Sequence, residues 1–348
     1  MAVHRAGLLA RKEWRLMLNF AIIGCGAIGS RHARQAAAFG RLKAVCDVVE
    51  EKAVRLGEEH HARHYVRIED LLQAEKELDL VAVCTPNGLH AMHTIMALEA
   101  GCHVLCEKPM ALTSVDCRKM IAVAAKAGKA LFVVKQNRFN PPVIAVKKIL
   151  EEGRLGRIYS VQVNCSWNRE GGYYKDSWHG TRDLDGGILF TQFSHFIDLL
   201  YWLIGDVRDA VGFSDNFAHQ GCIDFEDTVA TSLRFESNAL ASLHFTINSY
   251  RKNMEGSLVI VGEKGTVKIG GQYLNTLEYL AIEGDERIDL SAGNPANSYG
   301  DYQGSMSNHD KMYGHVVDVL TNGASNLFGG GEGLKTVEII EKIYQAAK

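Results

Sequence analysis

The sequence predicts an α/β protein in two parts, an N-terminal doubly wound parallel sheet and a C-terminal α+β domain with an open, mostly antiparallel sheet. Three observations lead to this prediction. Up to about residue 138, apolar strand-like segments alternate with helix-like segments, as in parallel α/β sheets. A glycine-rich turn at residues 24–29 joins the first strand to a helix. Beyond residue 138, strand signals follow one another, and 348 residues suffice for two domains.

The first element is the stretch NFAIIGCGAIGSRHARQAA, residues 19–37. Residues 20–23 are a continuous apolar run typical of a buried strand, and residues 28–39, rich in alanine and free of proline, favour a helix. Gly24, Gly26 and Gly29 have the G-x-G-x-x-G spacing of a Rossmann turn, in which they permit the bend, pyrophosphate approach and close helix packing. The alternative is a buried strand that runs by chance into a glycine-rich loop.

Asp47 follows the second predicted strand, residues 42–46. It lies 23 residues after Gly24, near the offset of about 20 at which a carboxylate binds the adenosine ribose hydroxyls. The same carboxylate would repel a 2′-phosphate, so the sequence predicts NAD rather than NADP. The alternative for Asp47 is an ordinary turn residue at the end of a strand.

The next elements continue the alternation. Helices are predicted over residues 50–59, 68–73, 90–100 and 114–127, the last capped by Thr113 or Ser114 and ended by Gly128. Strands are predicted over residues 78–84, 103–107 and 130–134. Ligands of such sheets bind beyond the carboxyl ends of the strands, and the expected ligand-binding segments are therefore residues 24–29, 47, 85–90, 107–109 and 136–138.

The pattern changes in the second part. A helix is predicted over residues 141–152, a strand over 157–167, an apolar helix over 188–205 and a final helix over 333–347. Strand signals repeat between residues 207 and 290, and TVATSLRF and LASLHFTI predict a hairpin across residues 236–239. The open face of this sheet needs a cover, which favours a homodimer or homotetramer. The predicted domains are residues 17–138, which bind NAD, and residues 139–348, which bind substrate and oligomerise.

Composition excludes several classes of protein. The net charge of −3 and the 47% hydrophobic content indicate a globular protein without a nucleic-acid or membrane surface. The eight cysteines form no C-x-x-C pair and favour a reducing, cytoplasmic setting. We expect no metal site, because no carboxylate or cysteine completes the histidines at positions 60, 61 and 64. Residues 1–16 are expected to be an extension outside the fold.

Two segments carry residues suited to proton transfer. Lys108, in CEKPMAL, follows a strand end, and a partly buried lysine beside a cationic nicotinamide ring would have a lowered pKa. The alternative is a solvated surface lysine. His195 lies on the apolar helix with Asp198 three residues later on the same face. A core histidine is the alternative there, and the preceding DLDGG segment favours a functional role.

The segments GCGAIGSRHA, CTPNGLH, AGCHVLCEKPMAL and DGGILFTQFSHFIDLLYWLIGDV resemble the Gfo/Idh/MocA oxidoreductase family and occur in its order. The resemblance implies that Lys108 and His195 are catalytic and that the Lys108–Pro109 bond is cis. From its position beside His195, Asp198 is expected to orient His195 or a substrate hydroxyl. His90 starts a helix near the cofactor, and a simple helix cap is the alternative for it. The residues expected at NAD are Gly24, Gly26, Ala27, Ile28, Gly29, Asp47, Thr85, Pro86, Asn87, His90, Glu107, Lys108, Gln136, Trp178 and His179.

Within the family, FVVKQNRFNPPV, YYKDSWHGT, EGSLVIVGEKGTVKIGG and EGLKTVEIIEKIY resemble dehydrogenases of UDP-linked N-acetylamino uronic acids, enzymes of surface-polysaccharide synthesis. That group oxidises the C3 hydroxyl to a ketone and regenerates NAD⁺ with 2-oxoglutarate. Arg138 and Arg169 are candidates for a carboxylate or diphosphate, since guanidinium binds both bidentately. The other candidate substrate residues are Tyr174, Thr191 and Gln192.

Some positions depart from the expected pattern. Thr191 stands four residues before His195, where many members carry an acid and the closer group an amide, and His179 stands where an arginine is expected. Arg182 replaces an expected tryptophan. These departures bear on the substrate more than on NAD. Two other functions remain open: an NAD-dependent dehydrogenase of a free sugar or inositol, and a non-catalytic NAD-binding sugar sensor.

Overall fold

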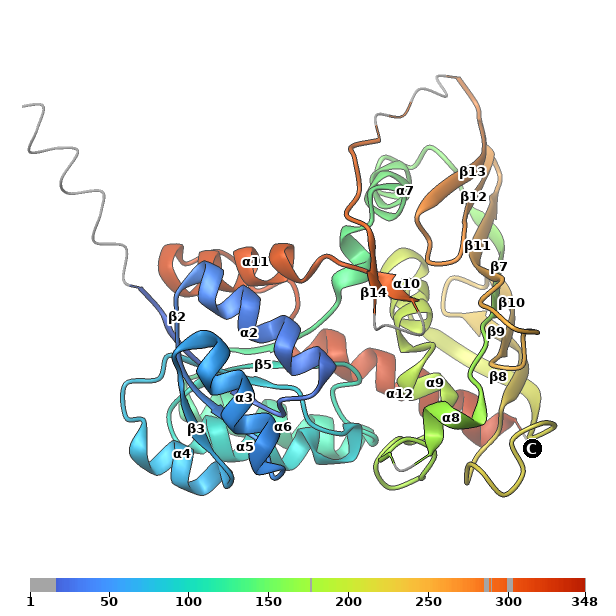
Figure 1. The fold of residues 1–348 in the computed structure, drawn as a ribbon. Coiled ribbons are helices and arrows are strands. Elements are labelled where there is room, and N and C mark those ends of the chain that lie inside the picture. Colours follow the sequence, from blue (N-terminus) through green and yellow to red (C-terminus); the bar gives the residue numbers. More distant parts are fainter. Residues whose placement is uncertain (1–16, 176, 285–287, 289, 299–302, 348) are drawn as a thin grey trace, which may run out of the picture.

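The computed structural model describes residues 17–175, 177–284, 288, 290–298 and 303–347 (Figure 1). The expected extension at residues 1–16 lies outside this range. The N-terminal part contains a six-stranded, entirely parallel sheet with the order β3-β2-β1-β4-β5-β6. Its strands are β1 (Asn19–Ile23), β2 (Arg41–Cys46), β3 (Arg63–Tyr65), β4 (Leu80–Val83), β5 (His103–Cys106) and β6 (Leu131–Val133). This sheet confirms the predicted doubly wound α/β fold.

Helices cover both faces of the parallel sheet because its strands are apolar on both sides. Phe20 and Ile22 of β1 belong to one buried cluster, whereas Ala21 and Ile23, the alternate residues, belong to the other. The first cluster packs under α2 (Ala27–Phe39) and α3 (Glu50–His60). The second packs under α4 (Ile68–Ala74), α5 (His90–Glu99) and α6 (Ser114–Ala127), whose predicted cap Thr113 accepts a hydrogen bond from the Asp116 amide.

The order of strands reverses between β1 and β4, which leaves a crevice at their carboxyl ends. Two short 3-10 helices follow β4 and β6 at this edge: η2 (Asn87–Leu89) and η3 (Gln136–Phe139). The Lys108–Pro109 peptide bond, just after β5, is cis as the family resemblance implies.

The second sheet has seven strands in the order β13-β12-β11-β7-β10-β9-β8, antiparallel except for the β7–β10 pair. They are β7 (Ile158–Ser166), β8 (Val207–Asp215), β9 (Thr228–Phe235), β10 (Leu240–Thr246), β11 (Glu255–Gly262), β12 (Gly265–Gly270) and β13 (Thr276–Ile282). The predicted hairpin is confirmed, with Arg234 opposite Leu240. A two-stranded sheet of β14 (Ala296–Ser298) and β15 (Gln303–Met306) lies apart.

Helices cover only one face of the second sheet. Buried and exposed residues alternate along β9 and β10, as expected for a sheet with one wet face. The helices of this part are α7 (Pro141–Glu151), α8 (Gly171–Tyr174), α9 (Ile188–Thr191), α10 (Ser194–Ile204) and α12 (Gly330–Ala346). None of the described helices is long and apolar enough to cross a bilayer.

Two features differ from the prediction. The apolar helix expected over residues 188–205 is broken into α9 and α10 at Gln192 and Phe193. Helix α11 (His309–Asn322) was not predicted, since its sequence has little apolar excess and Gly314 in its second turn. It forms because tertiary packing stabilises it: Tyr313 contacts the Phe20 ring, with centroids 5.8 Å apart. Figure 1 shows α11 lying along α2, over the N-terminal sheet.

Candidate active site

A pocket of about 660 Å³ lies at the carboxyl edge of the parallel sheet and continues against the second part of the chain. Its N-terminal wall follows the ends of β1, β2, β4, β5 and β6, as expected for a doubly wound sheet. The predicted site residues that line it are Gly24, Gly26, Ala27, Ile28, Asp47, Thr85, Pro86, Asn87, His90, Glu107, Lys108, Gln136, Arg169, Trp178, His179, Thr191, Gln192 and His195.

The glycine turn has the geometry that a pyrophosphate requires. Gly24 has φ +95°, and a Cβ there would lie 2.5 Å from the Cys84 carbonyl oxygen. At Gly26, the N-cap of α2, no atom lies within 4 Å of an added Cβ, and no side chain caps the helix. The first amides of α2 therefore remain available to an anion. Gly29 does not line the pocket. A Cβ there would meet the Gly24 carbonyl oxygen at 1.8 Å, so Gly29 serves helix packing.

Asp47 is fixed in the part of the pocket that follows β2 by backbone amides. Its Oδ2 accepts a hydrogen bond from Cys25 N at 2.7 Å, and its Oδ1 accepts one from Val49 N at 2.9 Å. Each carboxylate oxygen keeps a lone pair for a ribose hydroxyl. The glycine turn and this carboxylate together fit NAD.

Lys108 reaches across the pocket from the end of β5. Its Nζ donates a hydrogen bond to the backbone carbonyl of Thr191, 2.8 Å away, at the end of α9. Burial lowers the pKa of Lys108, although the nearby carboxylates of Glu107 and Asp185 oppose that shift. The lysine is therefore a partly buried, directed donor rather than the solvated surface residue that was its alternative.

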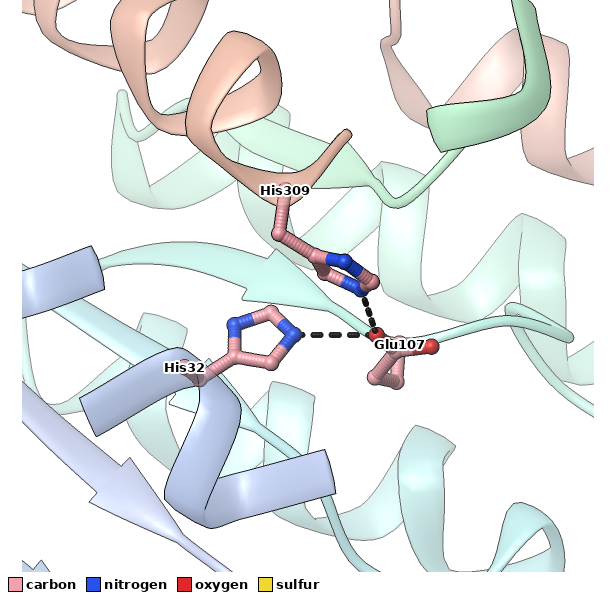
Figure 2. A group of neighbouring side chains, drawn as sticks. All are labelled: His32, Glu107 and His309. Carbon is pink, nitrogen blue, oxygen red and sulfur yellow. Dashed lines mark hydrogen bonds and ion pairs between the residues drawn. The ribbon is translucent and has the colours of Figure 1, made fainter. Parts of the chain in front are cut away.

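Glu107, directly before Lys108, is held by two histidines from distant parts of the chain (Figure 2). Its Oε1 lies 2.9 Å from His32 Nε2 and 3.3 Å from His309 Nε2, and its Oε2 accepts from Lys108 N. Burial would raise the pKa of Glu107, but hydrogen bonds from His309 and His32 hold it well below its usual range. Among the described residues these three form a group whose donor atoms lie within 4.8 Å of one another. Two imidazole Nε2–H groups donating to one carboxylate oxygen account for the geometry.

Sequence reasoning missed this group because its members are far apart in the chain. His32 is separated from Glu107 by 75 residues, and His309 by 202. His309 opens α11, the helix that was not predicted.

His195 faces the pocket from the first turn of α10. It is 5% exposed, and its Nε2 lies 3.1 Å from the side-chain nitrogen of Gln136. Burial first and the Lys108 charge second hold the pKa of His195 well below its usual value, so its imidazole is neutral near pH 7. Gln136 also donates to Ser305 Oγ at 3.1 Å. Ser305, with Gly304, brings the β15 segment to the pocket, which the sequence did not predict.

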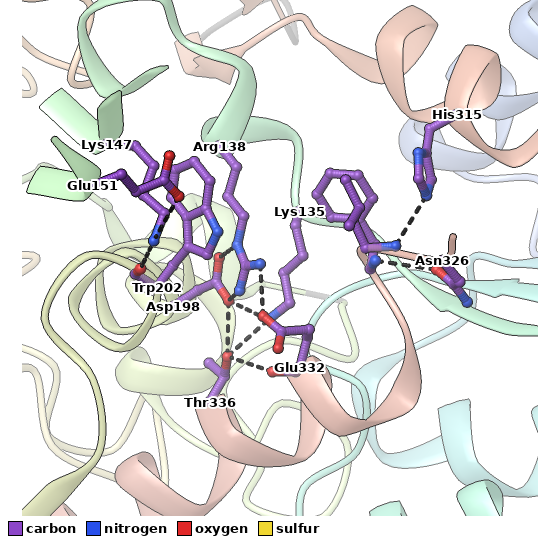
Figure 3. A network of polar contacts seen from close by, with 12 residues as sticks. Lys135, Arg138, Lys147, Glu151, Asp198, Trp202, His315, Asn326, Glu332 and Thr336 are labelled. Atoms are coloured by element: carbon purple, nitrogen blue, oxygen red, sulfur yellow. Dashed lines mark hydrogen bonds and ion pairs between the residues drawn. The ribbon is translucent and has the colours of Figure 1, made fainter. Parts of the chain in front are cut away.

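Two predictions, for Asp198 and Arg138, need correction (Figure 3). Asp198 does not contact His195; its carboxylate accepts from Arg138 Nε and Nη2 at 2.8 and 2.7 Å and pairs with Lys135 Nζ at 2.7 Å. Arg138 also binds Glu332, 2.7 Å away, and is 3% exposed outside the pocket wall. A buried charge pairs in this way because an unpaired one would be costly. Arg138 is therefore held in an ion cluster and does not line the pocket.

The aromatic loop also differs in detail from the prediction. Tyr174 is buried away from the pocket, and its neighbour Tyr173 lines the wall instead, stacked on His179 with ring centroids 4.4 Å apart. Arg169 does line the pocket, where its guanidinium lies 5.4 Å from the rings of Trp167 and Tyr173. Trp167 was not among the predicted site residues, whereas Tyr173, Tyr174 and Trp178 were considered as aromatic side chains that could stack on a ligand ring.

Thr191 and Gln192 stand at the break between α9 and α10. Thr191 Oγ1 accepts from Asn87 Nδ2 at 2.7 Å and also contacts the buried carboxylate of Asp185. Gln192 is 4% exposed, and neither polar atom of its amide has a partner among the described residues. A buried, unpaired amide on a pocket wall is suited to a polar ligand group.

Comparisons with known proteins agree with this geometry. A family model described as "Oxidoreductase family, NAD-binding Rossmann fold", GFO_IDH_MocA, matches residues 18–135, and one for the GFO/IDH/MocA C-terminal domain matches residues 143–268. The structure resembles the WlbA dehydrogenase of Chromobacterium violaceum in complex with NADH and UDP-GlcNAcA. The TM-score is 0.87 and the identity 35%, over 95% of this chain and 94% of that one.

Two curated relatives have different activities. Inositol 2-dehydrogenase 2 of Saccharopolyspora erythraea is 28% identical over 275 residues, 77% of this chain and 78% of its own length. The 2,7-anhydro-N-acetylneuraminate hydratase of Escherichia coli is 30% identical over 262 residues, 74% of this chain and 68% of its own.

Proposed function

The chain belongs to the Gfo/Idh/MocA family of NAD-dependent sugar oxidoreductases, and we propose that it oxidises the C3 hydroxyl of a UDP-linked N-acetylamino uronic acid to a ketone. One observation carries the proposal. The likeness to a dehydrogenase that holds NADH and UDP-GlcNAcA extends over 95% of the chain, including both walls of the pocket.

The proposed mechanism divides the reaction between the two parts of the chain. NAD, when bound along residues 24–29 and Asp47, supplies the hydride acceptor. His195 Nε2 takes the hydroxyl proton, for which its neutral imidazole is suited. Lys108 Nζ donates a hydrogen bond to the same oxygen and stabilises its negative charge as the proton leaves. Trp178 and His179 are proposed to contact the cofactor from the second part of the chain.

Substrate recognition is proposed for the polar side chains of the second wall. Arg169 is the remaining guanidinium candidate for the carboxylate or diphosphate, since Arg138 is held by Asp198 and Glu332. Gln192 offers an amide without a partner among the described residues. Asn87 Nδ2 donates a hydrogen bond to Thr191 Oγ1 and so positions Thr191. The backbone carbonyl of Thr191 in turn accepts a hydrogen bond from Lys108 Nζ and fixes the direction of the lysine side chain.

The test is a single incubation of purified protein with UDP-N-acetylglucosaminuronic acid, NAD⁺ and excess 2-oxoglutarate, analysed by mass spectrometry. A sugar nucleotide lighter by two hydrogens together with 2-hydroxyglutarate would support both the substrate and the proposed recycling of NAD. The oxidised sugar without 2-hydroxyglutarate would support the substrate and reject this acceptor. If protein that binds NAD yields neither of these products, the proposed substrate is rejected.

The inositol dehydrogenase relative supports a second candidate, a dehydrogenase of a free sugar or inositol. The two candidates differ in what stabilises the NAD-bound protein. A rise in melting temperature with UDP-GlcNAcA, and none with inositol or free sugars, favours the first candidate, and the reverse favours the second.

Assembly and location are proposed on separate observations. Val211 and Phe213 of β8 and Leu240 of β10 are 67%, 76% and 51% exposed on the helix-free face of the second sheet. We propose that this face is the contact of a homodimer or homotetramer. Phe213→Asp should then lower the mass in sedimentation equilibrium, and an unchanged mass would place the contact elsewhere. Seven of the eight cysteines are buried free thiols, which supports a reducing, cytoplasmic setting.

A further inference from the structure

A small internal cavity lies behind the active-site pocket. Its volume is about 10 Å³, which is close to the least space that holds one water molecule. Lys108 and His195 are the two described residues that line both this cavity and the pocket, so the proposed catalytic pair forms the wall between them. The opposite wall contains Lys135 and Asp198.

The polar groups around the cavity have unused hydrogen-bonding capacity. Ser194 Oγ is buried and has no partner among the described residues. Lys135 Nζ donates to Thr336 and Asp198, which leaves one of its three N–H hydrogens available to another acceptor. Asp198 Oδ1 binds Arg138, Lys135 and Thr336, whereas its Oδ2 accepts from Arg138 alone. These groups suit the two to four polar partners that a buried water needs.

The imidazole of His195 is a further polar group in the wall of the cavity. Its Nε2 is turned toward Gln136, which lines the pocket and not the cavity. Among the described residues, its Nδ1 has no hydrogen-bond partner. A neutral imidazole that accepts a proton at Nε2 carries its own hydrogen on Nδ1 and needs an acceptor there.

We propose that the cavity holds one ordered water that accepts a hydrogen bond from His195 Nδ1 and donates one to Asp198 Oδ2. The water couples the histidine to a buried carboxylate that does not touch it. When His195 takes the substrate proton at Nε2, the imidazolium so formed is stabilised through the water by Asp198. No covalent bond changes in this coupling, and Asp198 is a positioning residue.

The arrangement matters because His195 lies among opposing charges. Glu107 and Asp198 favour its protonated form, whereas Lys108 and Lys135 oppose it. The Asp198 carboxylate is itself fixed by Arg138, which is tied in turn to Glu332 (Figure 3). Asp198 cannot turn toward His195 without breaking these contacts, so a water is the connection that the geometry allows.

The test uses two variants of Val337, a fully buried apolar residue that lines the cavity and does not line the pocket. Val337→Ile adds a methylene group and should exclude the water, whereas Val337→Ala enlarges the space and should keep it. Crystal structures of the NAD-bound wild type and both variants should show the water in the wild type and in Val337→Ala only. A wild-type cavity without ordered density would overturn the proposal.

The second readout is the pH profile of sugar oxidation. The coupling rests on the proposed role of His195 as base, but the crystal structures test the water even if the proposed substrate is wrong. In Val337→Ile, the acid limb of kcat/KM should move down by about one pH unit and kcat should fall roughly three- to tenfold. Val337→Ala should stay within about twofold of the wild type. If Val337→Ile has lost the water but keeps the pH profile of the wild type, the coupling is refuted.

Discussion

Lys108 and His195 come from different parts of the chain and meet on one pocket wall, each with its pKa lowered by burial. Lys108→Ala removes the donor to the developing oxyanion, and His195→Ala removes the proton acceptor. Each variant should lower kcat by about 10²- to 10⁴-fold. NAD affinity should change little, because the glycine turn and Asp47 supply most of the cofactor contacts. The check is steady-state turnover beside NAD affinity from protein-fluorescence titration. Turnover within twofold of wild type in either variant would remove that residue from the mechanism.

Asp47 should determine which dinucleotide is accepted. Its carboxylate is held by two backbone amides beside the glycine turn, where a 2′-phosphate would meet its negative charge. Asp47→Ser should weaken NAD binding about tenfold and strengthen NADP binding, which calorimetric titration of both dinucleotides measures. Glu69→Gln is a matched control, because it removes a second carboxylate of the same pocket wall without touching the amides of the turn. Unchanged discrimination in Asp47→Ser would contradict the assignment.

At this scale the sequence predicted residues whose roles depend on local context. Gly24, Gly26, Asp47, Glu107 and Lys108 lie next to strand ends, and all five line the pocket. Predictions failed where a side chain's partners lie far along the chain. Asp198 and His195 share a helix face, but Lys135 and Arg138 lie close enough to form ion pairs with the Asp198 carboxylate. Nothing in the spacing from residue 195 to residue 198 could indicate this.

At the scale of elements, the turn between β1 and α2 requires glycine at two positions for two different reasons. A Cβ on Gly29 would overlap the Gly24 carbonyl, whereas a Cβ on Gly26 has open space and an ordinary backbone conformation. Gly29→Ala should therefore lower the melting temperature by several degrees, since helix and strand must separate. Gly26→Ala should keep the fold and weaken NAD binding, because the methyl group occupies the position of the pyrophosphate.

Differential scanning fluorimetry with and without NAD separates the two effects. In Gly26→Ala the melting temperature without NAD should match the wild type, and the rise on adding NAD should be smaller. Equal melting temperatures for Gly29→Ala and the wild type would show that the turn tolerates a side chain at position 29.

Elements with strong periodicity were predicted to within a few residues, as the β9–β10 hairpin and α6 show. The break between α9 and α10 and the whole of α11 were not. Both depend on contacts with distant segments: Lys108 binds the carbonyl at the end of α9, and Tyr313 of α11 packs on β1. A local pattern cannot report stabilisation of that kind.

At the scale of the whole molecule, buried histidines make stability depend on pH. Burial lowers the pKa values of His90, His195 and His309 below the value of about 6.5 for an exposed histidine. Below that pH the unfolded chain binds protons that the folded chain does not, so stability falls as the pH falls. Each histidine should cost roughly 1 kcal/mol between pH 6.5 and 5.5.

Urea unfolding at pH 7.5, 6.5 and 5.5 measures this dependence. His309→Gln keeps a donor toward Glu107 and should reduce the loss of stability between pH 6.5 and 5.5 by roughly 1 kcal/mol, the contribution of one buried histidine. A slope equal to that of the wild type would mean that His309 is already protonated in the folded protein. Below about pH 4.5 the buried carboxylates of Glu107 and Asp198, whose pKa values are lowered in the fold, should add a further loss.

The return of α11 to the first sheet has a consequence for how the protein is made. His32 and Tyr313 are hydrogen-bonded across 281 residues, and His309 meets Glu107 across 202. At a synthesis rate of about 5–20 residues per second, the ribosome needs roughly 14 to 56 seconds to make the segment between His32 and Tyr313. Throughout that interval the nascent N-terminal domain exposes the apolar surface of Phe20 that α11 later covers. Apolar surface exposed in this way is prone to aggregate until it is covered, and the N-terminal sheet gains its contacts with α11 only when almost the whole chain has been synthesised.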